Sequence, residues 1–432
     1  MTELILNINT SNGLALKVDE RLRYTYSNEI LTYNQDYINI SSIIDNKINK
    51  LVISERIGLL LRRFGIRLEN NFINALLDAS KLIARKLLYG APIVVRMHND
   101  CDGFSGAFAI FKLAEKIFNT DKIRHISFRA NSSISYSLES FNYDKSFLQL
   151  FRSIEKPLII LIDFGSTKET IDIIRGNTSI DFIIIDHHPY DIDIEGIRII
   201  NSYTAINDNS ITAGFMTALI AYIIEELDVY DIINSSFISD HSRYALYNDH
   251  SEKLAYVIDY MMNNKSIDYS FYKIADTIQS NETTESLYKD IIRKVNEVVT
   301  LAEKEGSLIQ LRNLSIFILD LNRFDSKHRY DYPKLGKLTS YLSIDLEKKY
   351  SSVLTIAYKR KSISIRISES AGRVVDLRYI KDKLKHSDIV SIGGHMQAGS
   401  IICRSDEATE EVVDSLVDLI SQRDLSISMY NS

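Results

Sequence analysis

The chain of 432 residues has little cysteine and no long apolar run, and each absence excludes a class of protein. Its two cysteines, Cys101 and Cys403, cannot form a disulfide framework, and neither lies in a CxxC pair, so zinc ribbons and redox motifs are excluded. No apolar stretch approaches the roughly 20 residues that cross a bilayer. The first residues, MTELILNINTSNG, contain neither a basic region nor a small-residue cleavage site. We therefore expect a cytoplasmic protein with no membrane partner.

The chain also lacks an excess of positive charge, because 57 acidic residues outnumber 51 basic ones and the formal net charge at pH 7 is -6. This balance argues against a protein that coats nucleic acid nonspecifically. Clustered catalytic carboxylates would contribute several of the negative charges, however, so net charge does not decide the substrate. The composition is otherwise that of a globular protein, and the length allows two or three domains.

The spacing of apolar residues changes along the chain. Weak alternation predicts short strands in the first 45 residues, and helical spacing predicts helices at 49–64 and 71–88. From residue 91, helical stretches alternate with short apolar runs at 93–97, 123–128, 157–163, 182–186 and 197–201. Uniformly apolar strands between helices favour an α/β fold with a parallel sheet covered on both faces, since a face exposed to water would alternate polar with apolar residues.

The second half of the chain follows a different pattern. A mostly helical stretch is expected from about 211 to 306. Strands are then predicted at 314–320, 352–358 and 362–368, with helices at 336–349 and 406–422. This part therefore predicts a second, smaller α/β domain.

Three of the predicted strands end in an acidic residue, with or without histidine. The residues in question are His98, Asp100 and Asp102 after the first, Asp163 at the end of the third, and Asp186, His187 and His188 at the end of the fourth. The carboxyl ends of parallel strands meet at one edge of a sheet, where so many carboxylates would repel one another unless cations neutralised them. Singly, a DxDG sequence, a histidine pair or an aspartate after a strand is also found in turns, ordinary packing and helix caps. Together they predict a metal site.

The kind of metal follows from the ligands. Mixed carboxylate and imidazole ligands suit Mn²⁺, and Mg²⁺ less distinctively. Two such ions about 3.5 to 4 Å apart could share one carboxylate, activate a water and stabilise a phosphoryl transition state. The chemistry that these residues predict is hydrolysis of a phosphate ester.

These residues resemble the motifs of a known family. HNDCDG at 98–103, IDFGS at 162–166 and IDHHP at 185–189 resemble motifs I to III of the DHH phosphoesterases. SIGGHMQAGS at 391–400 resembles the GGHxxAAG signature of the attached DHHA1 domain, although Ala398, Gly399 and Ser400 replace its Ala-Ala-Gly end. A helix and an aspartate after motif III resemble the fourth motif, which points to Asp240.

The resemblance implies a role for each of these residues. One metal would be held by His98, Asp100 and Asp163, and the other by Asp102, Asp163, His187 and Asp240, so that Asp163 bridges the two. Asp186 would orient the histidines and His188 would face the substrate phosphate, both as catalytic residues. In the DHHA1 part, a phosphate would be bound by Arg366, Gly393, Gly394 and His395.

The order of segments most resembles the RecJ-like branch, especially its archaeal nucleases. It implies N-terminal strands and a helical lead-in at 1–90, a DHH domain at 91–245, a helical connector at 246–310 and a DHHA1 domain at 311–432. The implied activity is that of a metal-dependent exonuclease on single-stranded DNA or RNA, with a helicase or a replication or repair protein as possible partner. Alternatives are a phosphodiesterase of short oligonucleotides or cyclic dinucleotides, a pyrophosphatase, and a noncatalytic replication scaffold. Every expected ligand is present, which favours an enzyme over a scaffold.

Overall fold

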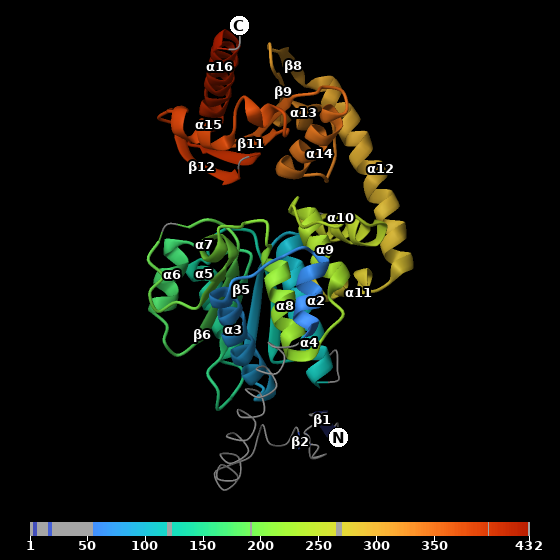
Figure 1. Ribbon diagram of the computed structural model, residues 1–432, viewed down its shortest axis with the longest axis vertical. Coiled ribbons are helices and arrows are strands. Elements are labelled where there is room, and N and C mark those ends of the chain that lie inside the picture. Colours follow the sequence, from blue (N-terminus) through green and yellow to red (C-terminus); the bar gives the residue numbers. More distant parts are fainter. Residues whose placement is uncertain are drawn as a thin grey trace. The chain divides into compact units, whose positions relative to one another are not determined.

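The described part of the structure, a computed structural model, comprises residues 3–6, 16–19, 55–118, 123–190, 192–264, 270–395 and 397–430. It forms two compact units (Figure 1). The first consists of Met1–Met262 with Tyr269–Glu285, and the second of Asn263–Asp268 with Ser286–Ser432. Of the expected N-terminal strands, an antiparallel pair is seen, β1 (Glu3–Leu6) with β2 (Leu16–Asp19). The rest of the first 45 residues and the predicted helical residues 49–54 lie outside the described residues.

The first unit is built around a five-stranded parallel sheet in the order β4-β3-β5-β6-β7. Its strands are β3 (Ile93–His98), β4 (Ile126–Asn131), β5 (Leu158–Ile162), β6 (Asp181–Asp186) and β7 (Ile199–Asn201). Its helices are α2 (Glu55–Arg63), α3 (Asn70–Leu88), α4 (Cys101–Phe118), α5 (Leu138–Leu148), α6 (Lys168–Arg175), α7 (Ser202–Ile206), α8 (Ala213–Glu225), α9 (Tyr230–Ser239), α10 (Asp249–Asn263) and α11 (Phe271–Ile278). The predicted parallel sheet is thus confirmed.

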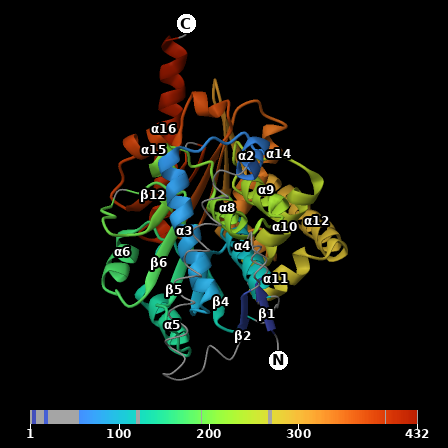
Figure 2. The ribbon, with the colours of Figure 1, turned by 60° about the horizontal axis from the view of Figure 1, so that its bottom comes forward.

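Helices cover both faces of this sheet, which is why its central strands are apolar throughout. On one face, Phe141 of α5 and Ile171 of α6 join Val94, Ile159 and Ile184 in a single buried cluster. On the other face, α4 packs on β3 and β5, and α8 packs on β5, β6 and α4 (Figure 2). Within the described ranges, none of the helices combines the length and apolar character needed to span a bilayer.

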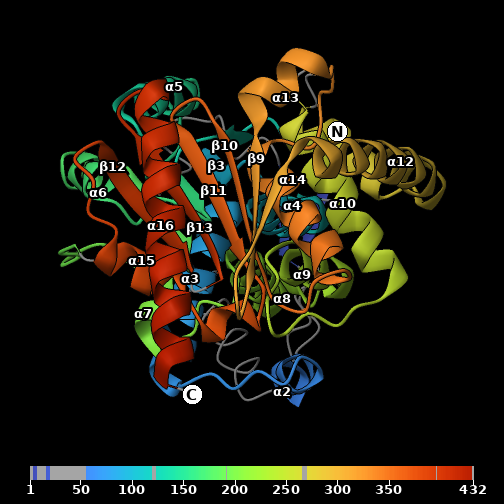
Figure 3. The same cartoon turned by 90° about the horizontal axis from the view of Figure 1, so that it is seen from above.

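The second unit contains a six-stranded mixed sheet in the order β12-β13-β11-β10-β9-β8. Its strands are β8 (Ser307–Gln310), β9 (Ser315–Asp320), β10 (Val353–Lys359), β11 (Ser362–Ile367), β12 (Ile389–His395) and β13 (Ala398–Cys403). Its helices are α13 (Leu321–Lys327), α14 (Leu335–Glu347), the short 3-10 helix η2 (Ala371–Arg373), α15 (Leu377–Lys383) and α16 (Asp406–Tyr430), while α12 (Asn281–Glu305) runs into it from the first unit. Apolar residues of α15 and α16 pack on one face of the sheet, and α14 packs on β10 and β11 (Figure 3).

Two details differ from the sequence-based expectation. The predicted strand at 123–128 begins three residues later, at Ile126, because Arg124 and His125 form a turn. Gly393 and Gly394, expected in a loop, lie in strand β12 of a hairpin with β13. Gly394 has φ +125°, and a Cβ atom there would lie 2.3 Å from the carbonyl oxygen of Ala398, so this position requires glycine.

Candidate metal centre

The predicted ligands lie where the strand order of the first sheet changes direction. β3 and β5 are neighbours, although β4 comes between them in sequence. The chain therefore leaves β3 toward one edge of the sheet and leaves β5 toward the other, and parallel sheets bind ligands at such points, beyond the carboxyl ends of the strands. His98 ends β3, Asp163 follows β5 directly, and Asp186 ends β6. The fold thus brings the three predicted groups together.

Asp163 lies at the centre of this arrangement. Its Oδ2 lies 3.4 Å from Nδ1 of His98, whereas its Oδ1 lies 3.2 Å from Nε2 of His187 and 3.7 Å from Nδ1 of His188. The side chain is 2% exposed, and the backbone adopts a left-handed conformation with φ 64°. Such a conformation is uncommon for a residue other than glycine and is concentrated at functional sites. The two oxygens of one buried carboxylate therefore face two different sets of ligands.

The first set of ligands consists of His98, Asp100 and Asp163, whose ligand atoms all lie within 4.8 Å of one another. Nδ1 of His98 lies 2.6 Å from Oδ2 of Asp100, and the charge of Asp100 raises the pKa of His98 to about 12. The other oxygen of Asp100 accepts a hydrogen bond from the backbone N–H of Gly103 in the first turn of α4. A Cβ atom at Gly103 would lie 2.5 Å from the carbonyl oxygen of His98, so only glycine allows this turn.

The second set consists of Asp102, His187 and Asp240. Nε2 of His187 lies 3.4 Å from Oδ2 of Asp240 and 3.9 Å from Oδ2 of Asp102. Nδ1 of His187 lies 2.7 Å from the carbonyl oxygen of Asn209. Because a carbonyl oxygen only accepts, Nδ1 donates, and Nε2 is left to face the carboxylates as a ligand would. Burial alone would lower the pKa of His187, but the charges of Asp240, Asp163 and Asp102 outweigh it and raise that pKa well above its ordinary value.

Asp102 is fixed by the amino-terminal end of α8. Its carboxylate is completely buried and accepts hydrogen bonds from the backbone N–H groups of Ala213 and Gly214 and from the hydroxyl of Ser236. Helix amino termini favour negative charge, which offsets part of the repulsion among the carboxylates. Burial and the charges of Asp163 and Asp240 nevertheless raise the pKa of Asp102. Its Oδ1 accepts two of the three bonds, so Oδ2 is the oxygen that faces His187.

Asp186 fixes the two histidines that follow it and is not a member of either ligand set. Its Oδ1 accepts from the backbone N–H groups of His187 and His188 and lies 2.8 Å from Nδ1 of His188. Burial alone would raise the pKa of Asp186, but the hydrogen bond and charge of His188 hold it well below its ordinary value. The side chain of His188 is 43% exposed, which makes it the most accessible of the three histidines at the centre.

The residues of the centre fit a pair of divalent cations. Oδ1 of Asp163 is buried and lacks a hydrogen bond of ordinary geometry within the described residues, which is costly unless a cation or proton approaches it. The donors are carboxylate oxygens and imidazole nitrogens, a set that suits Mn²⁺ or Mg²⁺. His98 and Asp100 would hold one ion, Asp102, His187 and Asp240 the other, and Asp163 both.

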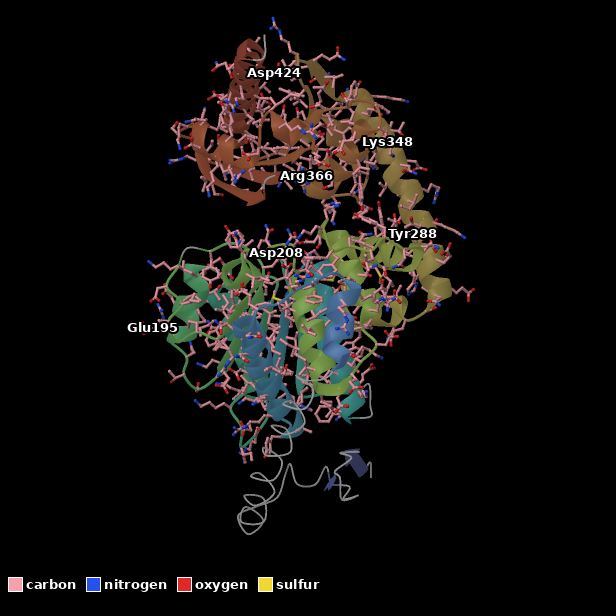
Figure 4. The ribbon with its side chains drawn as sticks, viewed as in Figure 1. Glu195, Asp208, Tyr288, Lys348, Arg366 and Asp424 are labelled. Carbon is pink, nitrogen blue, oxygen red and sulfur yellow. The ribbon has the colours of Figure 1, made fainter. Side chains whose placement is uncertain are left out.

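The four residues predicted to bind a phosphate lie in the second unit. The Arg366 guanidinium donates to the hydroxyl of Ser340 and to the carbonyl oxygens of Ile365 and Gly336 (Figure 4). In the sheet, Ala398 is in register with both Arg366 and His395, and Gly393 and Gly394 precede His395 in β12. The side chain of His395 lies outside the described residues.

The residues that support the ligands are not marked by any sequence motif. Asn209 fixes the orientation of His187, and Ser236 donates to Asp102. Asn209 stands in a polar loop without any motif. Ser236 could have been suspected, because Asn234, Ser235 and Ser236 form a polar run in a helix that is otherwise largely apolar and buried.

Comparison with known proteins places these residues in a family. Residues 92–240 match the DHH family, N-terminal domain. An uncharacterized protein of Methanocaldococcus jannaschii is 24% identical over an alignment that covers 75% of this chain and 51% of that protein. The chain thus spans about half the length of the curated relative that it matches.

Solved structures share the fold. The DHH domain of a protein described as a member of the s1p family of ribosomal proteins superposes with a TM-score of 0.70 at 20% identity, over 91% of this chain and 99% of that one. CDC45 from Entamoeba histolytica superposes with a TM-score of 0.50 at 10% identity, over 81% and 99%. The match to the DHH family contains every predicted ligand from His98 to Asp240, and we conclude that the segment 92–240 is similar to the DHH family, N-terminal domain.

Proposed function

We propose that the protein is a phosphodiesterase that uses two divalent cations to remove nucleotides from the ends of single-stranded DNA or RNA. The observation that carries this proposal is the position of Asp163, whose two oxygens face His98 on one side and His187 on the other. A carboxylate with ligands on both sides supports a pair of ions rather than one. Bound there, the cations would supply the positive charge that makes a water nucleophilic and stabilises a phosphoryl transition state.

The remaining groups of the centre suit a phosphate substrate. His188 is partly exposed beside Asp163, and its hydrogen bond to Asp186 holds the ring next to the bridging carboxylate. Asp186 stabilises a protonated His188 and fixes its ring. His188 would therefore bind and orient the scissile phosphate, and could hold a proton next to it.

The second unit supports a substrate with more than one phosphate. Arg366 is partly buried, and every oxygen that accepts from its guanidinium in the described part of the chain is neutral. Burial lowers the pKa of Arg366 to about 10, since no carboxylate offsets the loss of hydration. A buried cation of this kind is stabilised by an anion. We propose a phosphate of the nucleic acid as that anion, in keeping with the resemblance of the GGH hairpin to the DHHA1 signature.

The length of the substrate distinguishes this proposal from its alternatives. With Mn²⁺ or Mg²⁺, the protein is expected to release mononucleotides from end-labelled single strands tens of nucleotides long, with a higher kcat/KM than on dinucleotides, and chelator should stop the reaction. Labels at either end and both DNA and RNA would be compared by gel electrophoresis. A preference for dinucleotides would replace the exonuclease by an oligonucleotide phosphodiesterase, and phosphate release from pyrophosphate alone would overturn both.

Replacement of Arg366 tests the role of the second unit. Arg366→Lys keeps the charge but loses the planar group that can donate two parallel hydrogen bonds to a phosphate. A charged hydrogen bond contributes about 1.5 to 3 kcal/mol, so KM on single strands should rise about 10-fold or more while kcat changes little. Arg378→Lys is the matched control, because Arg378 is an exposed residue of the same unit that pairs with Asp376. An unchanged KM for Arg366→Lys would contradict phosphate binding there.

A further inference from the structure

One buried carboxylate connects two stretches of the chain that contain predicted metal ligands. Asp259, in helix α10, is 3% exposed. Its Oδ1 accepts a hydrogen bond from the backbone N–H of Cys101 at 3.0 Å, and its Oδ2 accepts from the hydroxyl of Ser239 at 3.0 Å. The two bonds cross 158 and 20 residues of sequence, respectively.

Both partners of Asp259 adjoin predicted ligands. Cys101 stands between Asp100 and Asp102, which belong to different ligand sets, and Ser239 immediately precedes Asp240. Asp259 thus connects the first turn of α4 to the end of α9. A shift of either stretch by a few tenths of an ångström would change the distance between Asp102 and Asp240, which both face Nε2 of His187.

The carboxylate of Asp259 also stabilises the first turn of α4 electrostatically. An anion at the amino terminus of α4 is favoured by the helix dipole and by an unpaired backbone N–H group. Hydrogen bonds to an ionised carboxylate are about twice as strong as neutral ones. Residues that hydrogen-bond directly to metal ligands typically change metal affinity 10- to 100-fold when they are replaced. Asp259 bonds to the neighbours of ligands, so we expect an effect at the lower end of this range.

We propose that Asp259 is a positioning residue that sets the spacing between the turn of Asp100 and Asp102 and the ligand Asp240. Part of the predicted helical connector, the segment 246–310, therefore belongs to the metal centre. The inference rests on the metal binding of the proposed function but does not depend on which phosphate ester is cleaved.

Titration of the full-length protein with Mn²⁺, without nucleic acid, tests this role. Asp259→Ala is expected to weaken binding of the ion held by Asp102, His187 and Asp240 by about 10-fold, as followed by calorimetry and by the electron paramagnetic resonance signal of free Mn²⁺. Ser239→Ala removes only one of the two bonds and should have a smaller effect of the same sign. Asp259→Asn retains the shape of the side chain and serves if Asp259→Ala does not fold.

The control is Asp249→Asn, on the same helix, where the carboxylate is exposed and pairs with Lys253. It should bind Mn²⁺ as the wild type does. Folded Asp259→Ala or Asp259→Asn protein that binds Mn²⁺ with wild-type affinity and stoichiometry would overturn the inference. If the wild type binds Mn²⁺ and the variants bind it weakly, but no single strand is cleaved, the proposed nuclease activity fails and the role of Asp259 stands.

Discussion

Asp163→Asn is expected to abolish binding of at least one cation and to lower the rate of phosphodiester hydrolysis by about a thousandfold or more. A cation at such a site contributes several kcal/mol to transition-state stabilisation, and each 1.36 kcal/mol changes the rate about tenfold. Asp163 belongs to the first ligand set and also faces His187 of the second, so its loss should weaken both. Activity would be measured at saturating Mn²⁺, and bound metal by calorimetry.

Asparagine is chosen because it removes the negative charge of Asp163 without adding strain to the left-handed backbone. Asn adopts the left-handed conformation more readily than most residues and has the shape of Asp, so the variant should keep φ near 64°. Without metal, two opposite effects act on the stability of the variant. A buried carboxylate is removed from among other carboxylates, but His187, whose pKa the charge of Asp163 helps to raise, loses that charge. The metal-free free energy of unfolding is therefore measured for each protein as its own reference.

With metal, the two proteins should differ in stability. A ligand at 100 times its Kd stabilises the folded state by about 2.7 kcal/mol, so Mn²⁺ should raise the free energy of unfolding of the wild type but not of Asp163→Asn. Asp193→Asn, which alters an exposed aspartate paired with Arg175, should respond to Mn²⁺ as the wild type does. A wild-type response of Asp163→Asn to Mn²⁺, in both stability and rate, would refute the two-cation centre.

The parts of the centre that the sequence predicts are those that follow apolar strands. VVRM, LIILI and FIII are buried on both sides of the sheet, so their composition marks the strands, and the strand order brings their ends together. The edge strand β4 is harder to place, since most of its residues are partly exposed and its apolar residues do not form a run. The residue roles assigned to the ligands remain predictions until metal binding is measured.

The contacts that the sequence did not predict join residues far apart in the chain. Asp259 and Asp144 stand in helices whose sequences contain no motif, and their partners lie 158 and 48 residues away. Nothing in the local pattern distinguishes a buried aspartate from one exposed on a helix surface, because amphipathic helices contain both. Arg96, within VVRM, hints at the contact with Asp144, since a charged residue in a buried strand requires a partner.

That partner is Asp144 of α5, whose side chain is 0% exposed. It accepts two hydrogen bonds from the guanidinium of Arg96, at 2.8 and 2.7 Å, one from Arg129 at 2.6 Å and one from the hydroxyl of Tyr136 at 2.7 Å. These partners come from β3, β4 and the segment before α5, so one carboxylate joins the edge of the sheet to the helix that covers it. Burial and the charge of Asp144 also raise the pKa of Tyr136, so its hydroxyl stays protonated and donates.

Asp144→Ala should therefore lower the free energy of unfolding by about 3 to 5 kcal/mol. Removal of one partner of a buried ion pair leaves the other charge buried and uncompensated, and the cost of that exceeds the value of the pair itself. Here two guanidinium groups and a phenol lose their common acceptor. Urea denaturation without metal would measure the change, because it leaves the cation centre out of the comparison.

The controls separate this mechanism from the loss of any aspartate. Tyr136→Phe removes one hydrogen bond but leaves both guanidinium groups paired, so it should cost about 1 kcal/mol. Asp193→Ala removes a carboxylate that pairs with Arg175 at the surface, and the free energy of unfolding should not change measurably. If Asp144→Ala were as mild as Asp193→Ala, the guanidinium groups of Arg96 and Arg129 would have to find water or other acceptors, and the network would not be what holds β4 and α5 to β3.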